Sequence, residues 1–233
     1  TIYDRRDEQR RLIRLLEQWG FAYWGMKGEE RVYVRDFCPR MDVAHLQLTY
    51  PYVSVSQAVY IVPIYPDYHT ELFPDSILNS ESPAEFVEDF PHRNCIGKVY
   101  VSRAMEPYPK PGDLLIFYRT GGYYKSVVTT IGVVQELRFD FKDEADFILY
   151  CRKSSVYPEE KLREMWRRSI HKPFAIRFLY VYSFPHRINM KELIDLKVLA
   201  GTDDAPRGFK PISREQFQLI LKATKSDDSF IVH

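Results

Sequence analysis

The sequence has few cysteines and no long apolar run, and each of these absences excludes classes of protein. Its 233 residues include three cysteines, Cys38, Cys95 and Cys151, which lie far apart and form no CxxC pair. This spacing supports neither a zinc knuckle nor a disulfide framework, so we expect idle thiols in a reducing compartment. No apolar run approaches the roughly 20 residues that span a bilayer. The first residues also lack the apolar region of a signal peptide, and we expect a cytoplasmic protein.

A charge excess and the common catalytic motifs are also missing. Lys and Arg number 33 against 32 Asp and Glu, which argues against a strongly basic protein that coats nucleic acid, although a local basic patch remains compatible. There is no GxSxG, HExxH or Cys–His signature, and we predict no catalytic residue, metal or cofactor. His69 and Glu71 form the one tight His–carboxylate pair. They have the form of a general base, but we favour a histidine that caps a turn.

Aromatic residues, in contrast, are abundant. They make up 15% of the chain, with 17 Tyr and 15 Phe, within a hydrophobic total of 45%. That total is enough for a substantial core. Tyrosine in this quantity often serves at surfaces where an apolar ring and a polar tip are both useful.

The first residues predict a helix, a turn and a strand. Over residues 7–19, Leu12, Leu15, Leu16 and Trp19 recur at helical spacing on one face. Gly20 follows at the left-handed position that commonly ends a helix. Residues 31–37 alternate like a strand. The irregular stretch 38–57, which contains several Ser and Pro residues, is the expected domain linker.

The remaining sequence predicts strands broken by short helices. Pro63 assigns the first of these strands to an edge or a bulge, and Gly132 predicts a bulge or barrel corner. Asn189 and Ser213 are expected helix caps. The long connection after residue 66, with helical turns expected at 74–78 and 83–87, predicts a cover or a site. Expected strands are 58–66, 98–102, 114–119, 125–137 and 173–184, and expected helices are 143–153, 159–168, 189–196 and 213–223. This order predicts an α+β fold with a small, partly closed β-barrel and helices at its ends.

The segment KPGDLLIFYR, followed by TTIGVVQEL, resembles the core of PUA-like domains, the superfamily that includes ASCH, EVE and YTH modules. Gly112 and Asp113 match the turn before a strand, Phe117 and Tyr118 match its aromatic end, and Gly132 matches the interior glycine of the returning strand. The resemblance extends over residues 58–222. It implies a PUA-like (ASCH/EVE-like) domain at 58–224, which leaves 225–233 as a flexible tail.

A second, smaller resemblance concerns residues 1–37. TIYDRRDEQRRLIRLLEQWGF followed by GEERVYVRDF is similar to the C-terminal end of a GNAT acetyltransferase fold, with a strand, a helix, Gly-Phe and a closing strand. The glycine-rich turn that cradles acetyl-CoA is absent before residue 60. We therefore expect acetyl-CoA as a cofactor only if a complete domain precedes this chain. Ile2 and Tyr3 resemble the end of a strand, so we expect a piece of a longer protein.

Aromatic side chains near the predicted hairpin are the best candidates for a binding site. Phe117 and Tyr118 point to opposite faces of their strand, so one of the two can face a barrel pocket. Tyr123 and Tyr124, on a glycine turn at the barrel mouth, have the form of a stacking platform for an unpaired base. The alternative is that these tyrosines only line the surface of a hairpin.

Basic residues give a second indication. Residues 152–187 hold nine Lys or Arg against three acids, which suits a phosphate backbone. The alternative is a solvated helix face neutralised by the acidic run 136–146. By the resemblance to ASCH-type domains, Lys98, Ser102 and Arg103 in GKVYVSR would present polar side chains to the cleft, with surface decoration as the rival interpretation.

These observations predict a module that binds nucleic acid, RNA above all, or a modified nucleotide by stacking a base. The alternatives are a target-selecting accessory domain of a GNAT-type acetyltransferase and a protein-interaction domain. The expected partner is RNA or DNA, including a modified base, with no membrane and an undetermined oligomeric state. The predicted binding residues are Lys98, Ser102, Arg103, Phe117, Tyr118, Arg119, Tyr123, Tyr124, Lys125, Arg167 and Arg168.

Overall fold

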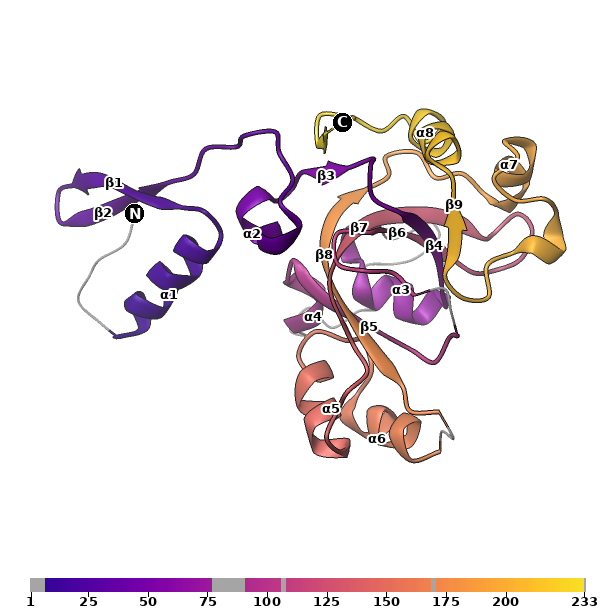
Figure 1. Cartoon of the computed structure of the whole chain (residues 1–233), viewed down its shortest axis with the longest axis horizontal. Helices are drawn as coiled ribbons and strands as arrows, with labels where there is room; N and C mark the ends of the chain where they lie inside the picture. Colours follow the sequence, from indigo (N-terminus) through magenta and orange to yellow (C-terminus); the bar gives the residue numbers. More distant parts are fainter. Residues whose placement is uncertain (1–6, 77–90, 106–107, 169–170, 233) are drawn as a thin grey trace. The chain divides into compact units, whose positions relative to one another are not determined.

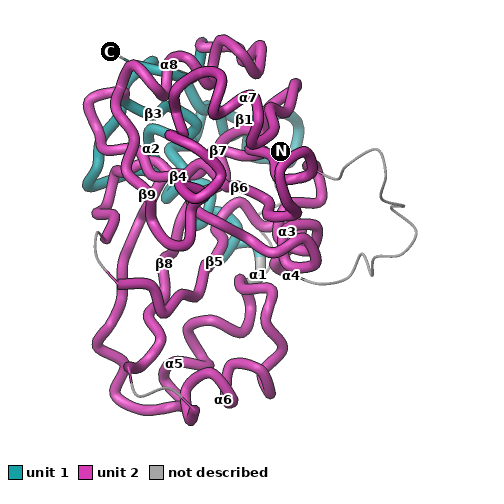
Figure 2. The backbone as a smooth tube through the Cα atoms, turned by 90° about the vertical axis from the view of Figure 1, so that its right-hand side faces the viewer, with its two compact units in different colours: residues 1–54, 229–233 teal, residues 55–228 magenta. Residues whose placement is uncertain are grey.

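The computed structural model describes residues 7–76, 91–105, 108–168 and 171–232. Two compact units divide the chain, one of residues 1–54 with 229–233 and the other of residues 55–228 (Figure 2). The C-terminal residues belong to the first unit because β10 (Ile231–Val232) pairs in parallel with β3 (Val53–Ser54). The expected flexible tail at 225–233 therefore contains a strand.

The first unit begins with the predicted helix, α1 (Asp7–Gln18), which is followed by Gly20 at a φ of +79°. An antiparallel hairpin of β1 (Ala22–Lys27) and β2 (Glu30–Val34) comes next. The expected linker at 38–57 is not irregular throughout, because it forms a 3-10 turn, η1 (Val43–His45), and a short helix, α2 (Leu46–Thr49). Its Tyr50 ring packs edge-on against Trp19, with ring centroids 5.4 Å apart, which ties this segment to α1.

The second unit is built on one six-stranded mixed sheet that curls into a half-barrel (Figure 1). The strand order is β5-β8-β7-β6-β4-β9, in which only the β4–β6 pair is parallel. This confirms the predicted α+β class. The strands are β4 (Val59–Ile64), β5 (Gly97–Ser102), β6 (Leu114–Arg119), β7 (Val127–Arg138), β8 (Phe174–Ser183) and β9 (Lys210–Ile212).

Two backbone predictions are confirmed in the sheet. The pairing of β7 with β8 shifts register between Ile131 and Gly132, so the interior glycine marks a bulge. β9 pairs with β4 only as far as Ile61, and Pro63 lies beyond that point. There β4 is locally an edge, which is where a proline without an N–H is tolerated.

The interior of the half-barrel is filled by the protein's own side chains. Phe117 and Phe178 from the sheet meet Phe73, which follows α3 (Pro66–Leu72), with centroids 4.6 Å (Phe73–Phe117) and 4.9 Å (Phe117–Phe178) apart. All three rings are fully buried. Rings in offset and tilted contact, as here, stabilise one another beyond the burial of their area. The inner face of the sheet is therefore a core, and a binding site must lie at its rim.

Helices close the ends and outer face of the sheet. Asn189 and Ser213 begin α7 and α8 with reciprocal capping boxes, which confirms the predicted caps. α5 and α6 lie side by side and pack on β5 through Val99 and Val101. The helices and turns are α3 (Pro66–Leu72), η2 (Pro74–Ser76), α4 (Pro91–Asn94), α5 (Glu144–Cys151), α6 (Glu159–Arg167), α7 (Met190–Asp195), η4 (Thr202–Asp204) and α8 (Arg214–Ala223).

The connection expected to be largely without structure contains a helix that the sequence analysis missed, α3. The helical turn expected at 74–78 is present as η2, and the one expected at 83–87 lies outside the described residues. Within the described part of the chain, no helix combines the length and apolar character needed to cross a membrane.

We predict that Gly132→Ala destabilises the second unit. A Cβ at this position would lie 2.6 Å from Cδ2 of the buried Phe178 ring and 3.2 Å from the Leu179 carbonyl oxygen. Overpacking of this kind costs about 1–3 kcal/mol, measurable as a lower free energy of unfolding in urea. Gly97→Ala is the matched control, because a Cβ there meets nothing within 4 Å. Equal losses in the two variants would contradict the assigned packing role.

Candidate functional site

Four tyrosine rings converge on one cavity of about 310 Å³ at the rim of the half-barrel. Tyr65 follows β4, Tyr68 lies on α3, Tyr100 on β5, and Tyr157 in the loop before α6. The Tyr68 and Tyr157 centroids are 4.7 Å apart, and those of Tyr65 and Tyr68 are 6.5 Å apart, both in edge-on geometry. This volume lies within the range of small-ligand sites. We call this site the tyrosine cavity.

Two hydroxyl groups in the tyrosine cavity, those of Tyr100 and Tyr157, are protonated at neutral pH. Burial raises the pKa of Tyr157 to about 12 and raises the pKa of Tyr100 further above its ordinary value. The Tyr100 hydroxyl donates a 2.8 Å hydrogen bond to the Pro63 carbonyl. Thr120 donates to the carbonyl of Ile64 from both its N–H and its hydroxyl, at 2.9 and 3.3 Å. The wall is therefore apolar with fixed polar edges.

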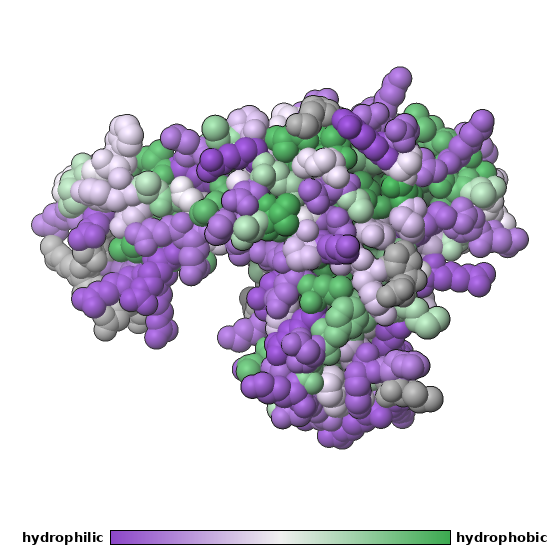
Figure 3. All heavy atoms as spheres, viewed as in Figure 1, coloured by the Kyte–Doolittle hydropathy of each residue, from purple (hydrophilic) through white to green (hydrophobic). Residues whose placement is uncertain are grey.

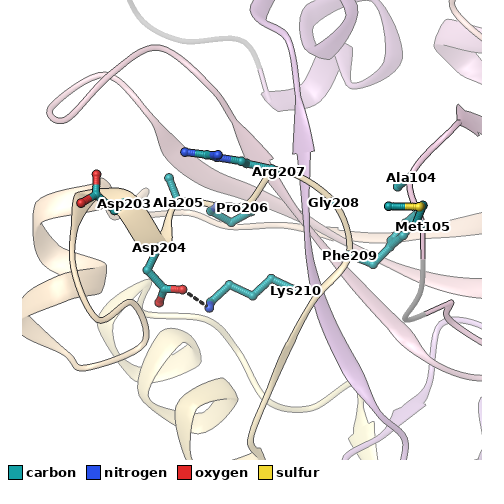
Figure 4. A pocket seen from close by; sticks show the side chains of 10 residues that line it. All are labelled: Ala104, Met105, Asp203, Asp204, Ala205, Pro206, Arg207, Gly208, Phe209 and Lys210. Carbon is teal, nitrogen blue, oxygen red and sulfur yellow. Dashed lines mark hydrogen bonds and ion pairs between the residues drawn. The ribbon is translucent and has the colours of Figure 1, made fainter.

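Arg207 gives the tyrosine cavity its charge. Its side chain is exposed at the edge, and no aspartate or glutamate of the described residues lines the cavity. Figure 4 shows Arg207 apart from the nearby ion pair of Asp204 and Lys210, whose Oδ1 and Nζ atoms are 2.6 Å apart. Flat ligands that are neutral or anionic match this lining.

A second cavity, of about 420 Å³, adjoins the tyrosine cavity along the loop 203–210 (Figure 4). Pro206 and Arg207 line both cavities, and Ala104 and Met105 form the opposite side of the second one. Acidic and basic residues both line this second cavity. It lies between the tyrosine cavity and the segment that follows β5.

Phe117 and Tyr118 are both buried, so the expectation that one of them faces a pocket is corrected. Phe117 is part of the inner core, and Tyr118 lies on the other face of β6. The reason is that the ring of Phe73 already covers Phe117. Tyr123 and Tyr124 are exposed on their turn and contact each other edge-on at 4.8 Å, but neither lines the cavities described above.

Lys98 does not present its amine to a cleft, which corrects the role expected from the resemblance. Its side chain is 3% exposed, and its Nζ donates to the carbonyls of His92 and Arg93 at 2.7 and 3.2 Å. Burial lowers its pKa to about 8. Ser102 accepts a hydrogen bond from the N–H of Ala104, so it shapes the turn that places the exposed Arg103 beside the cavities.

The positive charges of α6 are largely neutralised by carboxylates of α5 and of α6 itself. Arg167 forms a bidentate pair with Glu144, at 2.7 and 2.9 Å, and Arg168 pairs with Glu164 at 2.6 Å. Hydrophilic side chains crowd the surface around α5 and α6 (Figure 3), where Arg163 also pairs with Glu144 and Glu159. The solvated-face interpretation therefore fits this helix. Lys125 is exposed on the 120–125 turn, and Arg119 is half-buried.

His69 and Glu71 do not form a catalytic pair. The His69 ring is fully buried, with Nε2 2.8 Å from the Thr129 hydroxyl and Nδ1 without a hydrogen-bond partner among the described residues. Glu71 instead contacts Arg93, with Oε2 3.2 Å from Nη1. Burial, together with the charges of Arg119 and Arg187, lowers the His69 pKa to about 3, which makes it a weak base. No group of three or more His, Cys, Asp or Glu within the described residues is placed to hold a metal ion.

The sequence analysis missed the tyrosines that line the cavity. Two of them could have been found in YPDYHTELF, because Pro66 suits the first turn of a helix and Tyr65, Tyr68 and Leu72 follow helical spacing. Tyr157 had no comparable local signal, since it approaches Tyr68 only through the tertiary fold.

Comparison with known proteins supports the fold. No protein-family model and no curated protein matches the chain. Among solved structures, ASCH from Zymomonas mobilis matches with a TM-score of 0.51 and 12% identity, over 70% of this chain and 94% of that chain. A mutant of that protein gives a TM-score of 0.49 at the same identity and coverage. Human THYN1, in complex with 5-methylcytosine containing DNA, gives 0.40 at 11% identity, over 73% and 99% of the two chains.

The match at 0.51 confirms the ASCH-like, PUA-like fold and, at 12% identity, shows the fold alone. The fold assignment rests on this match and on neither of the two matches with lower TM-scores. The GNAT-like fragment expected at residues 1–37 remains a prediction, which none of these three matches supports.

The buried His69 predicts a loss of stability in mild acid. Its pKa is about 3 in the folded protein and roughly 6.5 in an unfolded chain. As pH falls below the unfolded value, the unfolded chain takes up a proton that the folded one does not, so stability present above that pH is lost. We expect His69 to lower the free energy of unfolding by about 1.4 kcal/mol between roughly pH 7.5 and 5.5.

This contribution is measured as the difference in pH dependence between the wild type and His69→Gln in urea unfolding. An unchanged pH dependence in His69→Gln would contradict the assignment.

Proposed function

We propose that the second unit binds RNA or DNA by holding one unpaired base, including a modified base, in the tyrosine cavity. The observation that carries this proposal is the convergence of Tyr65, Tyr68, Tyr100 and Tyr157 from three separate segments on one cavity that no carboxylate of the described residues lines. Aromatic side chains are the common means of binding unstacked bases in single strands, loops and bulges.

Tyr65 and Tyr157 differ in how far their rings are exposed to solvent. Tyr65 is 69% exposed at the entrance, so its ring offers a face to an incoming base. Tyr157 is half-buried and is held by Tyr68. Stacking contributes roughly 1–3 kcal/mol per base. The Tyr157 hydroxyl, which burial keeps protonated, can donate to an acceptor on a base edge.

Arg207 supplies the contact to the backbone in this proposal. A guanidinium at the rim is suited to bidentate contact with a phosphate. Because such contacts position the strand without reading its sequence, the base in the cavity is what the module would recognise. One or a few phosphate contacts also give a shallow dependence of affinity on salt.

Tyr65→Ala tests the proposal through fluorescence anisotropy with labelled single-stranded and duplex RNA and DNA. We expect the wild type to favour unpaired strands, and Tyr65→Ala to lose roughly 1–3 kcal/mol of binding free energy. Tyr124→Ala is the matched control, because Tyr124 is equally exposed at 69% and lies outside the cavity. Absence of binding by the wild type at low salt would overturn the proposal, as would equal losses in the two variants.

Exposed apolar side chains on the first unit favour a second candidate function, the binding of a partner protein. Trp24 is 78% exposed on the β1–β2 hairpin, beside the exposed Tyr23 and Met26, and exposed apolar groups of this kind often mark interaction sites. The role of a target-selecting domain beside an acetyltransferase remains a prediction from the sequence of residues 1–37.

A further inference from the structure

A third cavity, of about 470 Å³, has an aromatic wall of its own, made of Tyr108, Phe139 and Phe174. The three rings contact one another, with centroids 4.9 Å (Tyr108–Phe139), 5.3 Å (Tyr108–Phe174) and 4.9 Å (Phe139–Phe174) apart. Phe139 is 47% exposed although it belongs to this cluster. Half-exposed rings backed by buried ones are rigid surfaces for stacking.

Basic side chains line this cavity. Among the described residues, Arg103, His171 and Lys172 line it, and no aspartate or glutamate does. Lys172 is held at the edge because its Nζ donates to the Trp166 carbonyl at 2.9 Å and lies 4.8 Å from the Trp166 ring centroid. Rings with cations and without carboxylates favour a ligand that is flat and anionic, as a nucleotide is.

The third cavity and the tyrosine cavity belong to one continuous surface. Ala104 and Met105 line both the third cavity and the cavity of Figure 4. Arg207 lines both the cavity of Figure 4 and the tyrosine cavity. Arg103, which lines the third cavity, is also close enough to Tyr157 to affect its pKa. The surface thus runs from one set of rings, past arginine side chains, to the other.

We propose that the third cavity binds a neighbouring nucleotide of the same strand whose base enters the tyrosine cavity. The ligand of this protein is then a single strand of two or more nucleotides, with its phosphates against Arg103, Lys172 and Arg207. This rests on the proposed function, because it takes the tyrosine cavity as the first base site. A regular duplex keeps its bases stacked and paired, so it cannot place them on two separate sets of rings.

The proposal is tested by the length of the ligand. The probes are a labelled mononucleotide and single strands of up to about eight nucleotides, a length within the usual site size of such proteins, each as RNA and as DNA. We expect wild-type affinity to rise tenfold or more from the mononucleotide to the longer strands. Phe139→Ala should weaken binding of the longer strands roughly 5- to 150-fold and so remove most of that rise.

A second variant covers the case in which Phe139→Ala disturbs folding. Lys172→Gln changes an exposed side chain and should lower the slope of log affinity against log salt by roughly 0.7 for a single strand. Lys153→Gln, exposed and away from the cavities, should keep the wild-type slope. Thermal unfolding of each variant shows whether it is folded.

The two proposals fail in different ways. If no strand binds at low salt, both are overturned. If strands bind and Tyr65→Ala weakens them, but affinity does not rise with length and neither Phe139→Ala nor Lys172→Gln has an effect, only the second site is overturned.

Discussion

One hydrogen bond links β5 to β4 at the edge of the half-barrel where the tyrosine cavity lies. β9 stops covering β4 beyond Ile61, and the carbonyl of Pro63 is bonded by the Tyr100 hydroxyl from β5, at the other end of the sheet. Losing it would leave a partly buried carbonyl unsatisfied, which costs more than the bond's net contribution. The Tyr100 ring also contacts Phe117 and Phe209. The same side chain therefore joins the sheet ends, the core and the cavity wall.

Closure of this kind explains why the proposed binding groups gather at the rim. The inner face of the sheet is occupied by Phe73, Phe117 and Phe178, so no room for a ligand remains there. Tyr65 and Arg207 instead come from short segments next to strand ends, where β4 ends and shortly before β9 begins. Loops anchored on a rigid scaffold are where binding side chains usually lie.

The sequence predicted those parts of the fold that depend on local chemistry. Capping residues and helical spacing predicted α7 and α8, and Gly132 predicted the bulge. Strand alternation correctly separated the faces of Phe117 and Tyr118 but had no information on what covers each face. That is decided by Phe73, more than forty residues earlier in the chain. The sequence therefore predicted an aromatic cleft at a barrel mouth, and the cavity proposed here as the base site is lined by other aromatic residues than the predicted ones.

The net charge of a surface also depends on residues that are distant in the sequence, and this affects how the protein could recognise a nucleic acid. The arginines of α6 appear as a basic patch in the sequence, yet Glu144 on the preceding helix neutralises Arg167 and contacts Arg163. With a formal net charge of +1 and few cations near the cavities, phosphate contacts can supply little non-specific affinity. Under the proposed function most of the binding free energy must then come from the rings. Such a protein would select strands by their accessible bases, because coating nucleic acid requires the charge excess that this chain does not have.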